Sequence, residues 1–416
     1  MTKKIIHKTF LLLFTLLIGL AIGGLDLYRE LTQPVPDGLP IHIAVIGPLT
    51  GADAAIGTSL RRGVELRVEK LNKMGGVGGR PVVLDFYDDQ NDVTKAREQA
   101  RKIVADGQAV GVIGHWYSSN SLEGGKVYQD NGIPAITPGS TNVAVTKENP
   151  WYFRAIFNDR IQGRFLANYT KMVLDRKAVA IVSEKRPYGQ FLTETFTQQA
   201  QKIGLNIVQK HVFATNDKKD DQFDVIVSKL KMLPDLDFVF MATHALEGAE
   251  LLRKLRVAGI DVQVLGPDAM ASKSFTDSFA NDPMEQENPG HFTSGTLVTT
   301  PLIFPTANEA AQSLREDYLA RFGEEPDWRI GYSYDAANIM LNGILKASLL
   351  GQQDNLSVFR ANIRDALAGI STGIQAVDGV TGPIYFDKEG DAQKSILIGS
   401  YDKGIIVSAL TQLQSI

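Results

Sequence analysis

Short apolar segments alternate with longer amphipathic segments along most of this chain, and this alternation constrains its fold more than any other feature. The apolar run 41–46 ends at Gly47 and Pro48, which predicts a buried strand. Apolar residues then recur every three or four positions between residues 60 and 71, which predicts a helix. Further strands are predicted at 81–87, 110–114 and 133–137, with helices at 91–105 and 119–130 between them. Such alternation is typical of parallel strands joined by crossover helices.

The same alternation of predicted strands and helices begins again in the second half of the chain. Strands are predicted at 178–183, 206–213, 236–242 and 262–266, separated by helices at 188–203, 222–231 and 246–259. Later segments predict a strand at 295–300, helices at 308–322 and 334–350, and a β pair made by 382–386 and 395–401. A chain of 416 residues is long enough for two or three domains. Two alternations of similar size therefore predict an α/β protein with two lobes.

The first residues have the pattern of a targeting segment. Several basic residues precede the apolar run 10–25, which is typical of an export signal. This run is long for a signal peptide and short for a membrane-spanning helix, so a cleaved signal and a retained anchor both stay open, with a buried core helix as the third alternative. Prolines in 31–40 predict an extended linker, so we assign 1–36 to the signal or anchor plus linker. The basic start places the rest of the chain outside the cytoplasm.

Composition excludes several classes of function. The chain has no cysteine, which excludes disulfides, thiolate metal sites and a lipid-modified cysteine. Its six histidines are far apart in the sequence, and its net charge of −4 argues against nucleic acid as a partner. We therefore predict no metal site, no cofactor and no nucleic-acid partner.

Ligands of open α/β sheets bind at the carboxyl ends of strands, so the residues that follow each strand are the candidate site residues. In the first half, Ser118 stands at the start of a helix, where a hydroxyl and free N–H groups can bind a carboxylate. Ser140 and Thr141 lie in a second hydroxyl-rich turn. For each segment, an ordinary cap or turn is the alternative.

Three further candidates follow strands in the second half. Tyr188 opens a helix after the strand 178–183, and its phenol can face a cleft or pack in the core. His244 follows another strand, either as a ligand contact or as a surface histidine. Asp268 follows a Gly-Pro pair, where its carboxylate can pair with a ligand ammonium or cap a helix.

The order of several motifs resembles that of the type I periplasmic binding proteins. The motifs are Gly47-Pro48-Leu49-Thr50-Gly51, Asn72 with Gly75-Gly76, Asp88-Asp89, Gly114 with Ser118-Ser119, Pro138-Gly139-Ser140-Thr141-Asn142, Phe153-Arg154, Gln162-Gly163, Tyr188-Gly189 and Gly266-Pro267. Each is weak alone, but their order from about residue 41 to the C-terminus is specific. Within that family, the chain looks most like the leucine/isoleucine/valine-binding receptors of branched-chain amino acid ABC transporters.

The resemblance implies two Rossmann-like lobes with parallel central sheets, joined by three crossings of the chain. It places 41–158 and 294–375 in lobe 1, and 159–293 and 376–416 in lobe 2. The lobes would then be built from discontinuous segments, which replaces the simpler expectation of two consecutive lobes.

The resemblance also implies a role for each candidate residue. Ser118 would bind the ligand carboxylate, and Ser140 and Thr141 would contact both carboxylate and ammonium. Tyr188 would line the wall of lobe 2, and Asp268 would pair with the ammonium.

Three positions depart from the branched-chain receptors. Asp268 stands where they have Glu, His244 where they have an aromatic residue, and Ile56 or a neighbour where they have Trp. The pattern predicts that the amino acid clamp is kept and that the side-chain pocket has changed.

We therefore expect a non-enzymatic receptor that closes around a small-molecule ligand, an amino acid, and acts as a monomer with an ABC permease in the membrane. A second hypothesis keeps the fold and changes the ligand to an amide, urea or other small polar molecule. A third is an exported hydrolase that uses Ser118 with His115, although no GxSxG motif is present. A fourth is the sensor of a membrane-bound signalling system.

Overall fold

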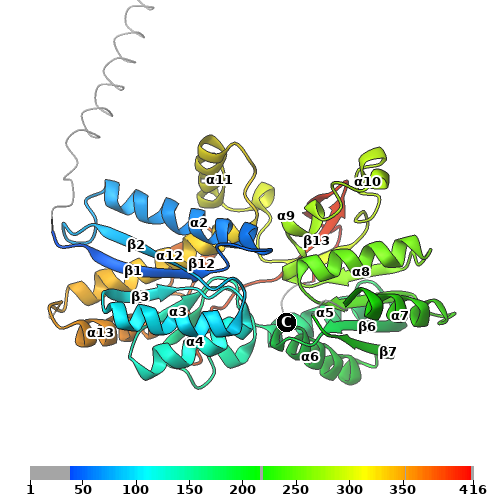
Figure 1. The fold of residues 1–416 in the computed structure, drawn as a ribbon, viewed down its shortest axis with the longest axis horizontal. Helices are drawn as coiled ribbons and strands as arrows, with labels where there is room; N and C mark the ends of the chain where they lie inside the picture. The colour runs from blue at the N-terminus through cyan, green and yellow to red at the C-terminus, as the bar shows by residue number, and fades with distance from the viewer. Residues whose placement is uncertain (1–37, 216–218, 352, 414–416) are drawn as a thin grey trace, which may run out of the picture.

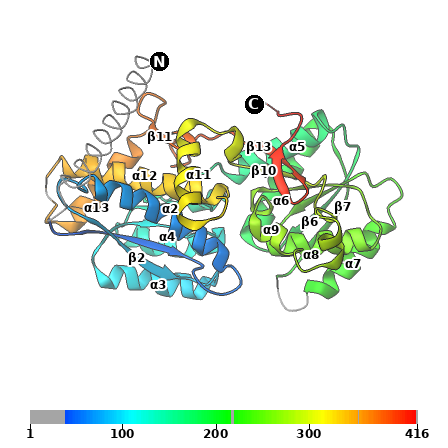
Figure 2. The ribbon, with the colours of Figure 1, turned by 90° about the horizontal axis from the view of Figure 1, so that it is seen from above.

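The structure, a computed structural model, describes residues 38–215, 219–351 and 353–413. In these ranges the chain forms two α/β lobes that lie side by side, each around its own sheet (Figures 1 and 2). The expected signal or anchor, 1–36, lies outside the described residues, so both alternatives stay predictions. No helix within the three ranges is long and apolar enough to cross a membrane.

The first sheet is parallel throughout, with strand order β2-β1-β3-β4-β5. Ile43 and Val45 of β1 pack into one hydrophobic cluster, and Ala44 and Ile46 pack into another. Successive side chains of a strand point to opposite faces, so a strand covered on both faces is apolar throughout. The bounds are β1 (Ile41–Gly47), β2 (Val82–Asp88), β3 (Ala109–Ile113), β4 (Ala135–Thr137) and β5 (Tyr152–Arg154).

Helices cover both faces of this sheet. On one face α2 packs against α12, and α12 against α13, while α3 packs against α4 on the other. The side chain of Asp92 caps the start of α3, and Gly107 ends this helix in the left-handed conformation. The bounds are α2 (Ala54–Lys73), α3 (Val93–Asp106), α4 (Ser118–Asp130), α11 (Glu309–Phe322), α12 (Trp328–Ser348) and α13 (Leu356–Ala368).

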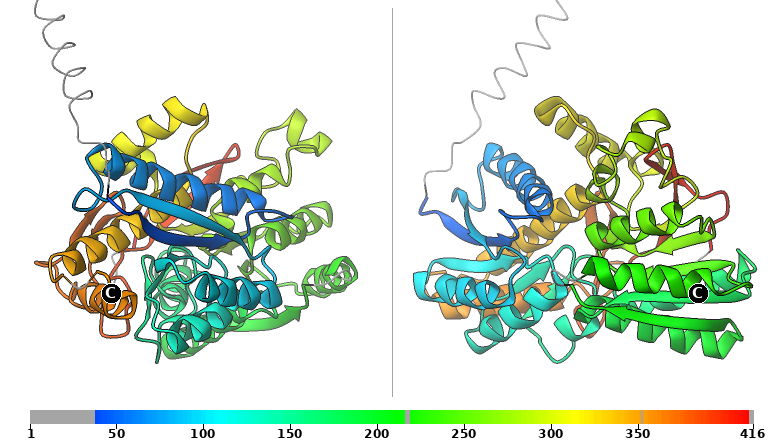
Figure 3. Two further views of the ribbon diagram at one scale, coloured as in Figure 1. Left: turned by 60° about the vertical axis from the view of Figure 1, so that its left-hand side comes forward. Right: turned by 45° about the vertical axis from the view of Figure 1, so that its right-hand side comes forward.

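The second sheet has the order β14-β13-β10-β9-β8-β6-β7, in which β13 pairs antiparallel with both β10 and β14 and the other pairs are parallel. Figure 3 shows the two lobes from two further directions. Its strands are β6 (Ala178–Glu184), β7 (Asn206–Phe213), β8 (Phe238–Ala242), β9 (Gln263–Gly266), β10 (Leu297–Thr300), β13 (Leu397–Asp402) and β14 (Ile405–Ser408). Its helices are α5 (Asp159–Met172), α6 (Pro187–Ile203), α7 (Lys219–Lys231), α8 (Ala245–Val257), α9 (Lys273–Asp277) and α10 (Pro283–Glu287).

Strand pairing corrects two of the expected lobe boundaries. We expected 294–375 in lobe 1, but β10 pairs with β9 in the second sheet. We expected 376–416 in lobe 2, but the hairpin of β11 (Val377–Gly379) and β12 (Gly382–Ile384) lies against α12, where Asp335 accepts hydrogen bonds of 2.9 Å from the N–H groups of Val380 and Thr381. The chain therefore passes between the lobes after β5, after β10 and before β13.

The expected β pair of 382–386 with 395–401 is wrong. β12 pairs with β11, whereas β13 pairs with β10 and β14. The segment between β12 and β13 first runs beside β5, where the Ala392 N–H donates to the Arg154 carbonyl, and then crosses to the other lobe. Two strands that belong to different lobes cannot share a ladder.

Candidate functional site

A cavity of about 360 Å³ lies between the two lobes. The segments that follow β1, β3 and β4 line it from the first lobe, and those that follow β6, β8 and β9 line it from the second, together with the start of α12. The carboxyl ends of parallel strands thus converge on one space, as expected for a ligand site in this fold class.

The structure separates the six residues expected at the site into two groups. Ser140 and Thr141 do not line the cavity, although Gly139 of the same loop does. The other four line it: Ser118, Tyr188, His244 and Asp268.

Buried carboxylates form one end of the site. Asp268 Oδ1 accepts hydrogen bonds of 2.8 Å from the Tyr188 hydroxyl and from Gln162 Nε2. The same Gln162 amide donates to Asp159 Oδ1 over 3.1 Å, which links the two acids. Burial raises the pKa of Asp268, and burial together with the charge of Asp268 raises the pKa of Asp159 well above its usual range. A cation bound here would lower both pKa values.

Unused hydrogen-bonding groups accompany these acids. The Asp159 N–H donates to the Thr141 carbonyl over 2.8 Å, so the two residues are in direct contact. The Thr141 hydroxyl is close enough to lower the pKa of Asp159, yet neither Thr141 Oγ1 nor Asp159 Oδ2 makes a hydrogen bond of good geometry within the described ranges. Neither residue lines the cavity, so the pair supports Asp268 through Gln162 instead of facing the ligand space.

The start of α4 offers the opposite polarity. Ser118 is its first residue, and the preceding Tyr117 provides no side-chain cap. The Ser118 hydroxyl accepts from the Asn142 N–H over 3.3 Å and lines the cavity. Because the first N–H groups of a helix lack intrahelical partners and carry partial positive charge, this end suits an anionic group.

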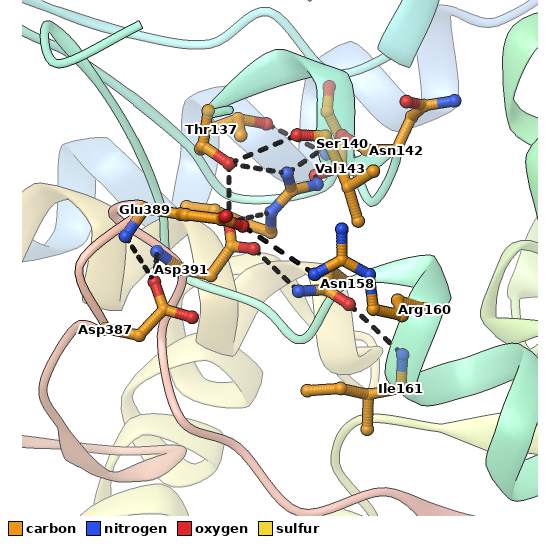
Figure 4. A network of polar contacts seen from close by, with 12 residues as sticks. Thr137, Ser140, Asn142, Val143, Asn158, Arg160, Ile161, Asp387, Glu389 and Asp391 are labelled. Carbon is orange, nitrogen blue, oxygen red and sulfur yellow. Dashed lines mark hydrogen bonds and ion pairs between the residues drawn. The ribbon is translucent and has the colours of Figure 1, made fainter. Parts of the chain in front are cut away.

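A buried arginine holds the loop that carries Ser140 and Thr141. Arg154 is fully buried, and its Nε donates to Asp391 Oδ1 over 2.8 Å. Its other nitrogens donate to the carbonyls of Ser140 and Asn142, which Figure 4 shows above Asp391. Asp391 also accepts from Asn158 Nδ2 over 2.6 Å, so the first and third crossings of the chain meet here. This network fixes the backbone that presents Thr141.

Ser140 is part of that support. Its hydroxyl lies 2.6 Å from the Ser121 hydroxyl and donates to the Trp116 carbonyl over 2.8 Å. Its N–H donates to Thr137 Oγ1 over 2.8 Å, and its carbonyl accepts from Arg154. Every polar group of Ser140 is thus engaged inside the first lobe.

Ion pairs surround the other end of the cavity. His244 Nδ1 lies 2.8 Å from Glu184 Oε1, and Arg186 Nη2 lies 2.7 Å from Glu184 and 2.8 Å from Glu247. Burial alone would raise the pKa of Glu184, but the charges of His244 and Arg186 outweigh it and lower this pKa to about 2. The Glu184 carboxylate therefore stays ionised and anchors both His244 and Arg186.

Aromatic rings connect the lobes across the cavity. The His244 ring of the second lobe lies 4.8 Å from the Tyr117 ring of the first, and 4.6 Å from the Tyr188 ring. The Tyr117 hydroxyl donates to Asp53 Oδ1 over 2.7 Å. Trp116 and Trp328, 5.7 Å apart, complete the aromatic lining.

Several lining residues were missed from the sequence. Asp53 and Arg186 follow β1 and β6, so the rule of reading strand ends could have found them. Trp328 and Arg329 follow no strand, and their helix was expected to begin at 334 instead of 328. No sequence signal indicated them.

The hydrolase hypothesis is not supported. His115 is fully buried, with Nδ1 2.7 Å from Asp89 Oδ2 and Nε2 3.0 Å from the Tyr128 hydroxyl. Both ring nitrogens are thus engaged away from Ser118, so they cannot activate its hydroxyl. Within the described ranges, no group of three or more metal-ligating side chains could hold a metal ion.

Comparison with known proteins agrees with this geometry. A family described as "Periplasmic binding protein" matches residues 40–404. The chain belongs to this family. The α/β fold with two lobes and the resemblance seen in the sequence are thereby confirmed.

Curated relatives of this periplasmic binding protein include two from Pseudomonas aeruginosa. A leucine-, isoleucine-, valine-, threonine- and alanine-binding protein is 27% identical over 377 residues, which is 90% of this chain and 92% of the relative. An amino acid binding protein is 30% identical over 298 residues, which is 71% of this chain and 75% of the relative.

Solved structures share the fold of this periplasmic binding protein. The leucine binding protein LivK from Thermotoga maritima superposes with a TM-score of 0.77 at 24% identity, covering 90% of this chain and 99% of that one. A solute binding protein from R. palustris in complex with benzoate has a TM-score of 0.75 at 18% identity, covering 91% of this chain and 97% of that one. At these identities the likeness shows the fold alone.

Proposed function

We propose that this protein is an extracytoplasmic solute-binding receptor of an ABC transporter and that it binds an amino acid between its lobes. The observation that carries the proposal is the opposite polarity of two buried groups. The start of α4 at Ser118 suits a carboxylate, and the acids Asp268 and Asp159 beside Thr141 suit an ammonium. An amino acid zwitterion has both charges.

Relatives support this assignment. The two relatives from P. aeruginosa are named for amino acids, and the R. palustris neighbour was solved with benzoate. Amino acids and benzoate share a carboxylate, whereas only amino acids have the ammonium. The buried acids of this chain therefore favour an amino acid over a simple carboxylate.

Each site residue has a separate role in this proposal. Ser118 binds the carboxylate and the Asp268 carboxylate accepts from the ammonium, while Thr141, which does not line the cavity, holds Asp159 beside Asp268. Tyr188 orients Asp268 through their 2.8 Å hydrogen bond, and His244 forms the wall opposite Tyr117. Ser140 supports the loop and does not touch the ligand.

Contacts across the cleft support a closing motion. Asn142 Nδ2 in the first lobe donates to the Pro187 carbonyl at the start of α6 over 2.8 Å, and the Tyr117 and His244 rings meet nearby. Lobes joined by short crossings can open and close as rigid bodies, and a ligand held by both favours the closed form. A membrane permease would recognise that form, and the receptor itself would act as a monomer and catalyse no reaction.

Isothermal titration of the twenty common amino acids tests the proposal. At least one should bind, and Asp268→Asn and Thr141→Val should each weaken it. Asp277→Asn and Thr276→Val, on helix α9 at positions that do not line this cavity, are matched controls that should leave binding unchanged. If no amino acid binds the wild type, or if both site variants bind like the controls, the proposal is wrong.

A second candidate is a small polar ligand without an amino group, such as an amide or urea. The observation that favours it is the set of charged side chains that line the cavity besides Asp268, among them Asp53, Arg186 and Arg329. Mass spectrometry of the ligand released from purified protein separates the two candidates, because only an amino acid would react with an amine-specific reagent.

A further inference from the structure

Arg329 is a buried cation in the cavity wall that the proposed amino acid clamp does not use. It is the second residue of α12, is 2% exposed and lines the cavity. Its guanidinium carbon lies 6.0 Å from the centre of the Trp328 ring, which lines the same space. It also borders a second cavity beneath α2, so it stands in the wall between the two.

The hydrogen bonds of Arg329 are incomplete. Nη1 donates to Asp327 Oδ2 over 3.2 Å and contacts Ser274 Oγ at 3.5 Å, which are long distances for a charged donor. Its Nε is buried and has no hydrogen-bond partner within the described ranges. Nη2 also has no hydrogen-bond partner within the described ranges and, unlike Nε, is not enclosed, so it is the donor to which a ligand in the cavity can supply an acceptor.

Arg186 repeats this pattern from the second lobe. Its Nη2 contacts Glu184 and Glu247, while its Nε is buried and has no hydrogen-bond partner in the same ranges. Arg186 and Arg329 both act electrostatically on the Tyr117 hydroxyl, so they lie around the same part of the cavity. Two unpaired guanidinium N–H groups therefore border one region.

The charged groups in this region have partners before any ligand binds, since Arg329 pairs with Asp327 and Arg186 with Glu184 and Glu247. Among the described residues, the charged side chains that line the cavity apart from Asp268 are two acids, Asp53 and Glu247, and two arginines. Asp53 accepts from the Tyr117 hydroxyl and, over 2.8 Å, from Asn91 Nδ2. His244 faces Glu184, which lies behind the lining. A second net charge on the ligand would have no counterion here.

From these contacts we propose that Arg329 determines specificity and that the ligand is an amino acid whose side chain ends in a neutral carboxamide. The amide oxygen accepts from Arg329, and the amide N–H donates to Asp53. This inference rests on the proposed function, since it names the side chain of the amino acid held at Asp268.

Other side chains suit this end less well. A branched aliphatic side chain would cover the Arg329 Nη2 donor without offering an acceptor, which is unfavourable. A carboxylate would pair with Arg329 but would face Asp53 and Glu247, and an ammonium would face the two arginines.

The test is a titration of purified protein with glutamine, asparagine, glutamate, lysine, leucine, isoleucine and valine. Glutamine or asparagine should bind at least tenfold more tightly than any of the other five. Arg329→Met should reduce that preference over leucine at least tenfold, and Arg329→Lys should reduce it as well, because lysine keeps the charge but lacks the forked N–H donors of the guanidinium. Arg321→Met, which removes an exposed ion pair with Glu69, is the matched control and should keep the preference.

Each outcome decides one point. A folding defect in a variant would lower the affinities for glutamine and leucine alike, so it would leave their ratio unchanged. The ranking of affinities in the wild type does not depend on any variant. If amino acids bind but leucine, isoleucine or valine binds as tightly as both amides, or if glutamate or lysine binds more tightly, this inference is wrong while the proposed function stands. If Arg329→Met keeps the preference, Arg329 does not determine it. If no amino acid binds, the proposed function itself fails.

Discussion

The two ends of the cavity are built differently. At the first end, Asp268, Gln162 and Tyr188 are fixed to one another by short hydrogen bonds and are almost fully buried. At the second end, ion pairs of partly exposed side chains such as Arg186 and Glu247 surround the cavity, and two guanidinium Nε atoms have no partner among the residues that the structure describes. The difference teaches that a rigid end can hold the ammonium and carboxylate that all amino acids share. An end with unpaired donors can instead distinguish one amino acid side chain from another.

The first and largest prediction concerns the support of the rigid end. Arg154→Met should lower the free energy of unfolding by about 3–5 kcal/mol, because it leaves the buried Asp391 without its ion-pair partner. Urea unfolding measures this loss. Removal of the exposed Arg321 should cost less than about 1 kcal/mol. Equal losses in the two variants would show that the buried network is not a support.

The second prediction concerns the rigid end itself. Asp268→Asn should weaken binding of every amino acid by about 2–5 kcal/mol, roughly 30-fold or more, because the ligand ammonium loses its buried counterion. Isothermal titration measures the loss, with Asp277→Asn as control. A loss for only some amino acids would mean that Asp268 contacts side chains, and the comparison between the two ends would then break down.

The third prediction uses the pH dependence of stability in the ligand-free protein. Burial raises the pKa of Asp159 in the folded state, so between about pH 4 and that raised pKa the folded protein holds a proton that the unfolded chain has lost. The contribution of Asp159 to stability is therefore largest at low pH and falls as the pH rises through this window. Urea unfolding at pH 5, 6 and 7 should show a flatter pH dependence for Asp159→Asn than for the wild type.

The pKa of Glu184 is shifted in the opposite direction to that of Asp159, and it sets the lowest pH that the experiment should use. Its pKa is lowered to about 2, so its stabilisation is present above its unfolded pKa and is lost as the pH falls toward 2. Measurements above pH 5 therefore exclude the titration of Glu184, and the comparison of the wild type with Asp159→Asn removes the contribution of the histidines that both proteins share. Equal slopes for the wild type and Asp159→Asn would refute the assignment.

The smallest expected effect belongs to His244. His244→Phe keeps a ring between Tyr117 and Tyr188. It removes the hydrogen bond to Glu184, but Glu184 keeps its contact with Arg186. Amino acid affinity should change by less than about tenfold, since one hydrogen bond contributes on the order of 1 kcal/mol. Titration beside His211→Phe, a control on β7, measures this. A hundredfold loss would place His244 in direct contact with the charged groups of the ligand.

Prediction from the sequence was accurate wherever a side chain follows a strand. The strand 41–46 is β1, 178–183 lies within β6, and 206–213 is β7. Tyr188 and Asp268 follow β6 and β9, and both line the cavity. Local patterns suffice there because a buried strand must be apolar and its carboxyl end must face the cleft.

Prediction failed where a residue reaches the site from elsewhere. β5 has only three residues and was not expected, so Asp159 just beyond it was not considered. The tail was expected to form one β pair, but its strands belong to different lobes.

The sequence by itself determined the family, the two α/β lobes and four of the residues that line the cavity, because these depend on periodicity and on short motifs. Only the tertiary structure decided where the chain crosses between the lobes, which supporting role Ser140 has, and that Arg329 enters the cavity from the start of α12. The physical reason is that these features depend on contacts between residues far apart in the chain, and no local pattern records which distant carbonyl or carboxylate a buried guanidinium will find.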